Sequence, residues 1–98
     1  MIKYKSFRKF IKKIYPQLSI QRRKCPSDCW GWYTDNQIIV SNEIIDEDFA
    51  VNILTHELSH FLADGKELIA HDRHFGVGYY KAYKLSFLHC YIHLQVIV

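Results

Sequence analysis

Hydrophobic residues recur at helical spacing in two stretches of the chain. In residues 3–15 they stand three or four positions apart, with Lys and Arg between them: Phe7, Phe10, Ile11 and Ile14. This spacing predicts an amphipathic helix that ends before Pro16. From about residue 47 to residue 63, apolar side chains occupy nearly every side of a second helix, which indicates burial. Asp46 is its expected N-cap, and Gly65 follows its end.

The segment between the two predicted helices is rich in β-forming residues. Residues 18–24 are short and β-tolerant, and the runs WGWYT and QIIVS are separated by the turn-forming pair Asp35 and Asn36. We expect two or three short strands that form a small antiparallel sheet. The fold class predicted for the single domain of residues 1–98 is therefore α+β.

The C-terminal third predicts one more helix, followed by a segment in which apolar residues alternate with polar ones. Asp72 can cap a helix that runs to about Phe87, in which Gly76 and Gly78 could allow close approach to the central helix. From residue 89 to residue 96, apolar and polar residues alternate, which favours a terminal strand over continuation of the helix.

The central helix carries the sequence His56-Glu57-Leu58-Ser59-His60, an HExxH motif. Residues four apart on a helix lie one above the other, so His56 and His60 can bind one metal ion. Glu57 is a quarter turn away, which suits a general base that contacts a water on the metal without being a ligand. Two imidazoles with an open position favour a single zinc ion as the cofactor.

A catalytic zinc ion normally takes three protein ligands, so a third is expected downstream. His71 and His74 are the candidates, and Asp64 and Glu67 are weaker ones. We favour His71, because the tight loop before it lets the earlier histidine reach back and because Phe75 can pack beneath it. His74 is then the alternative third ligand.

The HExxH motif, a variable loop and His71-x-x-x-Phe75 before an aromatic helix resemble the SprT-like and WLM group of minimal zinc metallopeptidases. The resemblance covers about residues 34–87 and implies a zincin-like fold. It implies that Glu57 is the general base and that the zinc ligands are His56, His60 and His71. In such a fold, the strand of residues 37–41 would place a sheet edge along the site, where an extended peptide could pair with it. Asp72 departs from the small residue usual after the third histidine, and the zinc ribbon of many SprT-like proteins is missing.

These features predict a zinc-dependent metallopeptidase that hydrolyses peptide bonds in a protein or peptide substrate, with Glu57 activating the water. A hydroxyl group from the following helix would stabilise the oxyanion; Tyr80 is our candidate, with Tyr79 and Tyr83 as alternatives. Two other functions stay open. One is a non-catalytic zinc-containing module that binds nucleic acid or protein, and the other is a regulatory protease resembling the ImmA/IrrE group.

The N-terminal quarter of the chain is basic. The formal net charge is +3, and before the first acidic residue, Asp28, the cations are Lys3, Lys5, Arg8, Lys9, Lys12, Lys13, Arg22, Arg23 and Lys24. This block could bind nucleic acid, and the resemblance adds weight because SprT-like proteases act on proteins attached to DNA. The alternative is a solvated outer face.

The remaining composition bears on compartment and redox state. No apolar run reaches the length of about 18 residues that a membrane helix needs, and the basic N-terminus lacks the apolar core of a signal peptide. We therefore expect a cytoplasmic or other intracellular protein with no membrane partner. Cys25, Cys29 and Cys90 are odd in number, which favours free thiols over a disulfide or a second zinc site.

Overall fold

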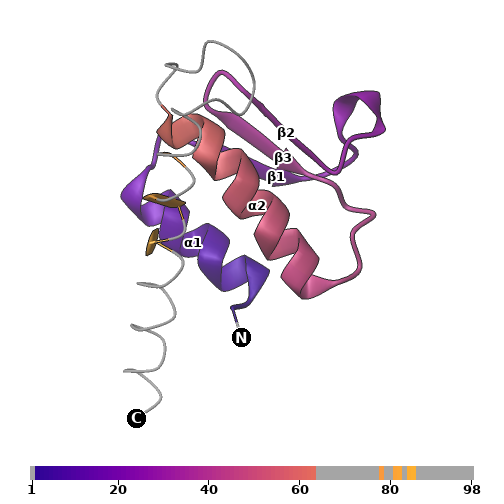
Figure 1. Ribbon diagram of the computed structural model, residues 1–98, viewed down its shortest axis with the longest axis horizontal. Coiled ribbons are helices and arrows are strands. Elements are labelled where there is room, and N and C mark those ends of the chain that lie inside the picture. The colour runs from indigo at the N-terminus through magenta and orange to yellow at the C-terminus, as the bar shows by residue number, and fades with distance from the viewer. Residues whose placement is uncertain (1, 64–77, 79–80, 83, 86–98) are drawn as a thin grey trace.

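The computed structural model describes residues 2–63 together with Gly78, Lys81, Ala82, Lys84 and Leu85. Its elements are α1 (Tyr4–Ile14), β1 (Ser19–Arg22), the 3-10 turn η1 (Pro26–Asp28), β2 (Gly31–Thr34), β3 (Gln37–Val40) and α2 (Glu47–Leu62), as Figure 1 shows. Two helices and a three-stranded sheet confirm the α+β prediction. Among the helices in the described part of the chain, none is both long and apolar enough to cross a membrane.

Helix α1 follows its predicted pattern except at its end. Tyr4, Phe7 and Ile11 are buried, and Phe10 packs against the core from its edge. Ile14, the last helical residue, is instead 41 % exposed. The predicted apolar face therefore covers the core over about the first two turns of α1, from Tyr4 to Ile11.

The three strands form a mixed sheet in the order β1-β3-β2. Strands β2 and β3 are an antiparallel hairpin whose two turn residues, Asp35 and Asn36, have φ values of 47° and 62°. These left-handed values are typical of a tight hairpin turn. Strand β1 pairs with β3 in parallel, so the prediction of an antiparallel sheet is wrong for this pair. The chain reverses direction twice between the two strands, and β3 therefore runs the same way as β1.

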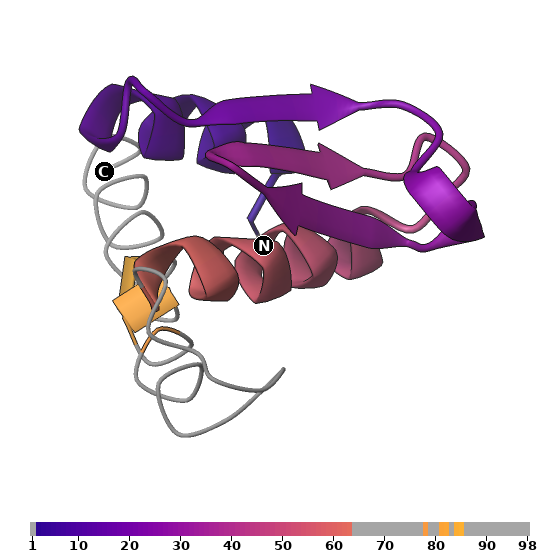
Figure 2. The same cartoon turned by 90° about the horizontal axis from the view of Figure 1, so that it is seen from above.

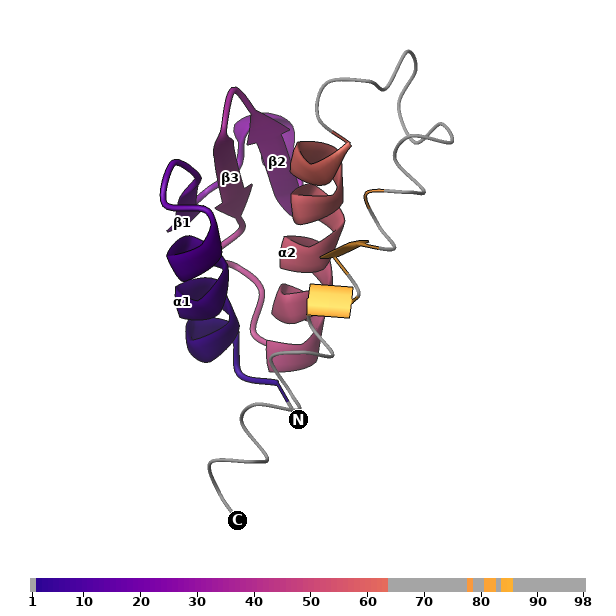
Figure 3. The same ribbon diagram turned by 90° about the vertical axis from the view of Figure 1, so that its left-hand side faces the viewer.

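The core lies between one face of the sheet and the two helices. In Figure 2, α2 runs along this face, and Figure 3 shows α1 next to β1 and α2 next to β2. Fully buried side chains from α1, β1, β3 and α2 meet there: Phe7, Ile11, Ile20, Ile38, Leu54 and Leu58. Apolar burial of this kind stabilises the fold by about 25 cal/mol per Å² removed from water.

Helix α2 begins as predicted. The Asp46 carboxylate accepts hydrogen bonds from the backbone N–H groups of Asp48 at 2.9 Å and Phe49 at 3.4 Å. These bonds satisfy two of the free donors at the helix start, and such a cap stabilises a helix by about 1 kcal/mol. Glu47, the first residue of α2, accepts a hydrogen bond from the backbone N–H of Tyr4 at 2.7 Å. The two helix N-termini are thereby joined.

The predicted C-terminal helix is described at five positions, Gly78, Lys81, Ala82, Lys84 and Leu85, and all of them have helical backbone. A Cβ atom on Gly78 would overlap the carbonyl oxygen of Ser59 and stand 2.9 Å from the backbone nitrogen of Ala63. Gly78 therefore lies against the backbone of α2, which confirms the predicted close approach at this residue. Gly76 and the predicted strand of residues 89–96 lie outside the described residues.

Candidate metal centre

His56 and His60 lie side by side on α2. Their ring centroids are 5.4 Å apart, and the ring planes are inclined by 72°. A zinc–nitrogen bond of about 2.0–2.1 Å places a ring centroid about 3.2 Å from the metal, so two rings at a tetrahedral angle have centroids about 5.2 Å apart. The observed separation fits two ligands of one zinc ion.

The two histidines are half-buried, whereas the sequence pattern indicated burial. On the same side of α2, Phe49 and Asn52 are exposed, so the helix is not apolar all round. This partial exposure leaves the imidazoles accessible to a metal ion.

Two buried hydroxyl groups lie beside the histidines in the sequence. Thr55 Oγ1 donates to the carbonyl oxygen of Val51 at 2.9 Å, and Ser59 Oγ donates to that of Thr55 at 2.8 Å. Each hydroxyl is satisfied inside the helix, so it can be buried without an unpaired polar group. The motif helix therefore tolerates polar residues on the side that faces the core.

Tyr33 of β2 lies beside His60. The two rings are nearly parallel at 6°, with centroids 6.4 Å apart, and Phe61 meets Tyr33 edge-on at 6.3 Å. These contacts restrict the orientation of the His60 ring. Tyr33 was not among the site residues predicted from the sequence, although a signal for it exists: a two-residue turn at Asp35 and Asn36 pairs Tyr33 with Ile38, whose side chain enters the core.

Glu57 is the buried member of the motif, with 8 % of its surface exposed. It lies against the start of β2, because a Cβ atom on Gly31 would stand 2.8 Å from Glu57 Oε2 and 2.6 Å from Ile53 Cγ2. Only a residue without a side chain fits this contact unless the neighbours shift. Gly31 was likewise not predicted as a site residue, and nothing local in the sequence marks it.

Cys25 lies within electrostatic range of Glu57. Burial raises the pKa of the Cys25 thiol above its ordinary value, negative charge on Cys29 and Glu57 raises it further, and Arg23 opposes them. The thiol donates to the carbonyl oxygen of Ile39 at 3.6 Å. Cys25 and the exposed Cys29 are free, as predicted, and Cys90 lies outside the described residues.

The sheet edge beside the motif is not the one that was predicted. Strand β3 is the central strand, so it has no open edge, and its neighbour β2 is the strand that touches Glu57 and His60. The prediction placed β3 at the edge because it precedes α2 in the chain. Sequence order does not determine strand order once a hairpin inserts its second strand into the sheet.

The other predicted site residues lie outside the described residues: His71, His74, Asp64, Glu67, Tyr79, Tyr80 and Tyr83. Within residues 2–63 and the five described positions after them, no three His, Cys, Asp or Glu side chains are grouped so that they could hold a metal ion. The structure thus brings together the first two predicted ligands and places the predicted base beside them, and the third ligand stays a prediction.

In comparisons with known proteins, no family model, no curated protein and no solved structure matches the chain.

Proposed function

We propose that this protein is a zinc-dependent metallopeptidase of the SprT-like type. The observation that carries the proposal is the pair of adjacent, half-buried imidazoles on α2, with the Glu57 carboxylate held between the same helix and β2. His56 and His60 would hold the zinc ion together with a third ligand, for which His71 is our candidate. The bound ion would lower the pKa of a water molecule toward about 7 and polarise the scissile carbonyl group.

The chain's own contribution to the reaction is proton transfer by Glu57. Its carboxylate takes a proton from the attacking water and later delivers a proton to the leaving amine. Gly31 and Ile53 pack against the Glu57 side chain and limit its rotamers, so the carboxylate is positioned before a substrate binds. Tyr33 likewise limits the orientations of the His60 ring.

Zinc content and peptidase activity of the purified chain test this proposal. We expect one zinc ion per chain and cleavage of an unfolded protein such as casein that stops when the metal is chelated. Glu57→Gln should retain the zinc and lose activity by at least about 100-fold, as for removal of a general base. Asp35→Asn, at an exposed carboxylate in the turn between β2 and β3, is the control and should be fully active. An active Glu57→Gln variant would exclude the mechanism.

A second observation supports nucleic acid as a partner. A hollow of about 1230 Å³ lies between α1 and β1, and all but one of its charged lining residues are cations: Lys3, Lys5, Arg8, Lys9, Arg22 and Arg23. The exception, Glu47, is hydrogen-bonded to the start of α1. Such a concentration of positive charge suits a phosphate backbone.

Part of this positive charge also has a role in the fold. Arg8 Nε donates to the carbonyl oxygen of Ile20 at 2.9 Å, Lys12 Nζ to that of Leu18 at 2.6 Å, and Arg22 Nη2 to that of Ile44 at 3.0 Å. These cations bind backbone at the outer side of β1 and before α2. The exposed lysines Lys3, Lys5 and Lys9 are therefore the better candidates for contact with phosphate.

The salt dependence of DNA binding tests this second proposal. Changing Lys3, Lys5 and Lys9 to Gln should weaken binding and reduce the slope of log K against log salt by about 0.7–0.9 for each phosphate that the variant no longer neutralises. Changing the exposed Lys13, Lys24 and Lys81 to Gln alters the net charge equally and should have a smaller effect. If the two triple variants weakened DNA binding equally, the basic residues of the hollow would be a solvated face and not a binding site.

A further inference from the structure

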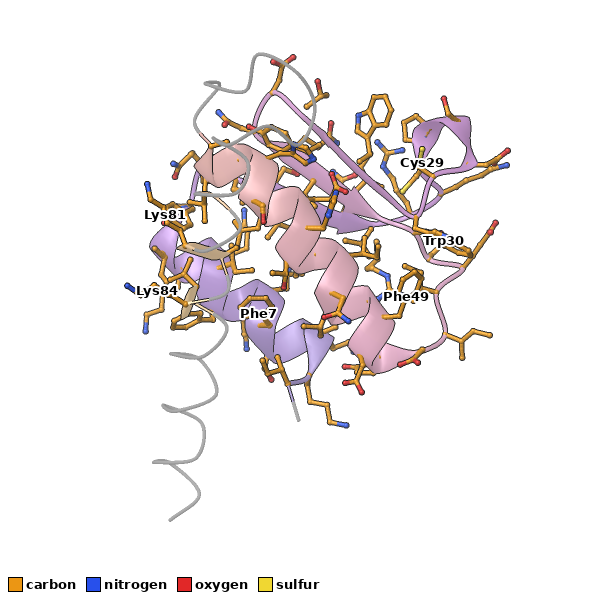
Figure 4. The ribbon with its side chains drawn as sticks, in the orientation of Figure 1. Phe7, Cys29, Trp30, Phe49, Lys81 and Lys84 are labelled. Carbon is orange, nitrogen blue, oxygen red and sulfur yellow. The ribbon has the colours of Figure 1, made fainter. Side chains whose placement is uncertain are left out.

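Two aromatic side chains form an exposed apolar pair beside the start of α2. Trp30 is 49 % exposed and Phe49 37 % exposed, and their rings meet edge-on at 5.8 Å and 75° (Figure 4). Ile45, four residues before Phe49, is 98 % exposed. Soluble proteins seldom leave large apolar side chains grouped on the surface, and such groups are typical of binding sites.

The aromatic pair continues the row of residues that includes the metal-binding histidines. Phe49, Ile53, His56 and His60 follow each other at intervals of four, three and four, so they share one side of α2. Strand β2 and the residue before it run along this row: Trp30 contacts Phe49, Gly31 lies over Ile53, and the Tyr33 ring lies beside and parallel to that of His60. The pair and the histidines are therefore parts of one continuous surface.

The distance along this surface matches a short length of extended peptide. Seven residues separate Phe49 from His56, which is about 10.5 Å along a helix. Three residues of extended chain span about 10 Å. A peptide whose scissile bond lies at the histidines would therefore present, at the aromatic pair, a side chain about three residues from that bond.

The charge around this surface adds a second property of the ligand. From Cys25 to Gly65 the sequence contains no Lys or Arg, whereas it contains several carboxylates. Of these, Glu43, Asp46 and Asp48 are exposed and lie one or two positions from Ile45 or Phe49 in the chain, so they outnumber Arg22, a cation that donates to the carbonyl oxygen of Ile44. A peptide with Lys or Arg beside its apolar residue is the complementary partner.

We propose that Trp30 and Phe49 bind a large apolar side chain of the substrate, about three residues from the cleaved bond, in an extended peptide that also carries Lys or Arg. This inference rests on the proposed peptidase function and assigns it a substrate class. The residues act in specificity, because neither is placed to touch the reacting atoms.

Cleavage-site profiling of a mixed peptide library measures the preference directly. We expect wild type to favour Leu, Met or Phe about three residues from the cleaved bond, on one side of it only. Trp30→Ala and Phe49→Ala should each remove this preference and lower kcat/KM for preferred peptides by about ten-fold, while peptides without the apolar residue are cleaved as by wild type. Phe49→Leu should restore most of the preference.

Ile14→Ala is the matched control, because Ile14 is 41 % exposed on α1 and lies outside this surface. Its cleavage profile should equal that of wild type. Thermal unfolding of each variant shows whether it is folded at the assay temperature. An unchanged profile in a folded Trp30→Ala variant would overturn the inference.

A binding measurement separates this inference from the proposed function. The zinc-loaded Glu57→Gln variant is mixed with a fluorescein-labelled peptide of Ala, Ser and Lys that contains one Leu, with its Leu→Ser form, and with a form in which Glu replaces Lys. We expect the peptide with Leu and Lys to bind about ten-fold more tightly than the Ser form or the Glu form. Adding Phe49→Ala to the Glu57→Gln variant should make the Leu and Ser peptides bind equally. If the wild-type chain cleaves no protein, the proposed function is refuted, and the same binding result would still show the apolar binding site.

Two results would overturn the inference. The first is equal binding of the Leu and Ser peptides. The second is self-association of the wild-type chain that Trp30→Ala abolishes, as measured by analytical ultracentrifugation, because the aromatic pair would then contact a second copy of the chain.

Discussion

The backbone of Gly31 lies directly against the carboxylate of Glu57. A Cβ atom at Gly31 would stand 2.8 Å from Oε2 and 3.0 Å from Cγ of Glu57, closer than non-bonded atoms normally come. Strand β2 and the motif helix therefore touch here with no side chain between them. The position of the proposed general base thus depends on a residue 26 positions earlier in the chain, outside the HExxH motif.

Gly31→Ala should impair catalysis more than metal binding. The added methyl group must displace Glu57 or Ile53, and a shift of about 1 Å at a catalytic group lowers the rate by about 100-fold. Overpacking should also lower the free energy of unfolding by about 1–3 kcal/mol. Peptidase assays, zinc titration and denaturant unfolding measure the three effects.

Thr34→Ala is the control for Gly31→Ala, since Thr34 is exposed at the other end of β2. It should change neither activity nor stability appreciably. If Gly31→Ala were as active as wild type, activity would not depend on the position of the Glu57 carboxylate, and Glu57 would not be the general base.

Tyr4→Phe should leave the stability unchanged or raise it by about 1–2 kcal/mol. Among the described residues, the Tyr4 hydroxyl group is the buried side-chain polar group without a hydrogen-bond partner, and burial also raises the pKa of Tyr4. Removing an unpaired buried hydroxyl group removes a desolvation penalty, while the ring keeps its contact with the Arg22 guanidinium, 4.7 Å from the ring centroid. Urea unfolding of both proteins measures the difference; a clear loss of stability would show that the hydroxyl group has a partner.

Cys25 should react with iodoacetamide more slowly than Cys29 at pH 8. Cys25 is buried and its pKa is raised, first by burial and then by the charges of Cys29 and Glu57, so little thiolate is present or accessible. Peptide mapping after timed alkylation resolves the two sites. Glu57→Gln removes one of the charges, so it should lower the Cys25 pKa and speed its alkylation; no change would contradict the proximity of the two residues.

The raised pKa of Cys25 also makes stability depend on pH. The folded state holds the thiol proton more tightly than the unfolded state, so the stabilisation is complete below the ordinary thiol pKa of about 8.5. It is lost as the pH rises from there through the folded value. Stability in a Cys29→Ser background should therefore fall more steeply in this range than in the Cys25→Ala, Cys29→Ser double variant.

The parts of the fold that depend on local pattern could be predicted from the sequence. Helix α2 agreed to within one residue at its end, and the Asp46 cap and the hairpin turn at Asp35 and Asn36 were correct, because each depends on neighbouring residues. The parallel pairing of β1 with β3 could not be predicted in this way. It arises from contacts between segments about 18 residues apart, which leave no periodic signal in either strand.

The same distinction applies to the candidate site. Spacing on one helix identified His56 and His60 as neighbours, and the structure places them so. Gly31 and Tyr33 contribute through the position of β2 over α2, so no motif contains them. Trp30 and Phe49 were likewise assigned no joint role, because the contact between them appears only when strand and helix are packed together.

The third zinc ligand is the last feature to be tested, and we predict His71. His71 and His74 are three positions apart in the segment after α2, and the earlier one is favoured by the tight loop before it and by the His-x-x-x-Phe spacing with Phe75. A residue that binds the metal directly contributes several kcal/mol to its affinity, whereas one that supports a ligand changes affinity by about 10 to 100-fold.

His71→Ala should therefore reduce zinc affinity far more than His74→Ala. Titration of both apo proteins with zinc, against a chelator of known affinity, gives the two constants, and circular dichroism shows whether each variant is folded. Asn52→Ala, an exposed residue of α2 near His56, controls for non-specific effects and should bind zinc like wild type. Wild-type affinity in His71→Ala would move the third ligand to His74 or Glu67, and weaker zinc binding by the corresponding variant would identify which of them it is.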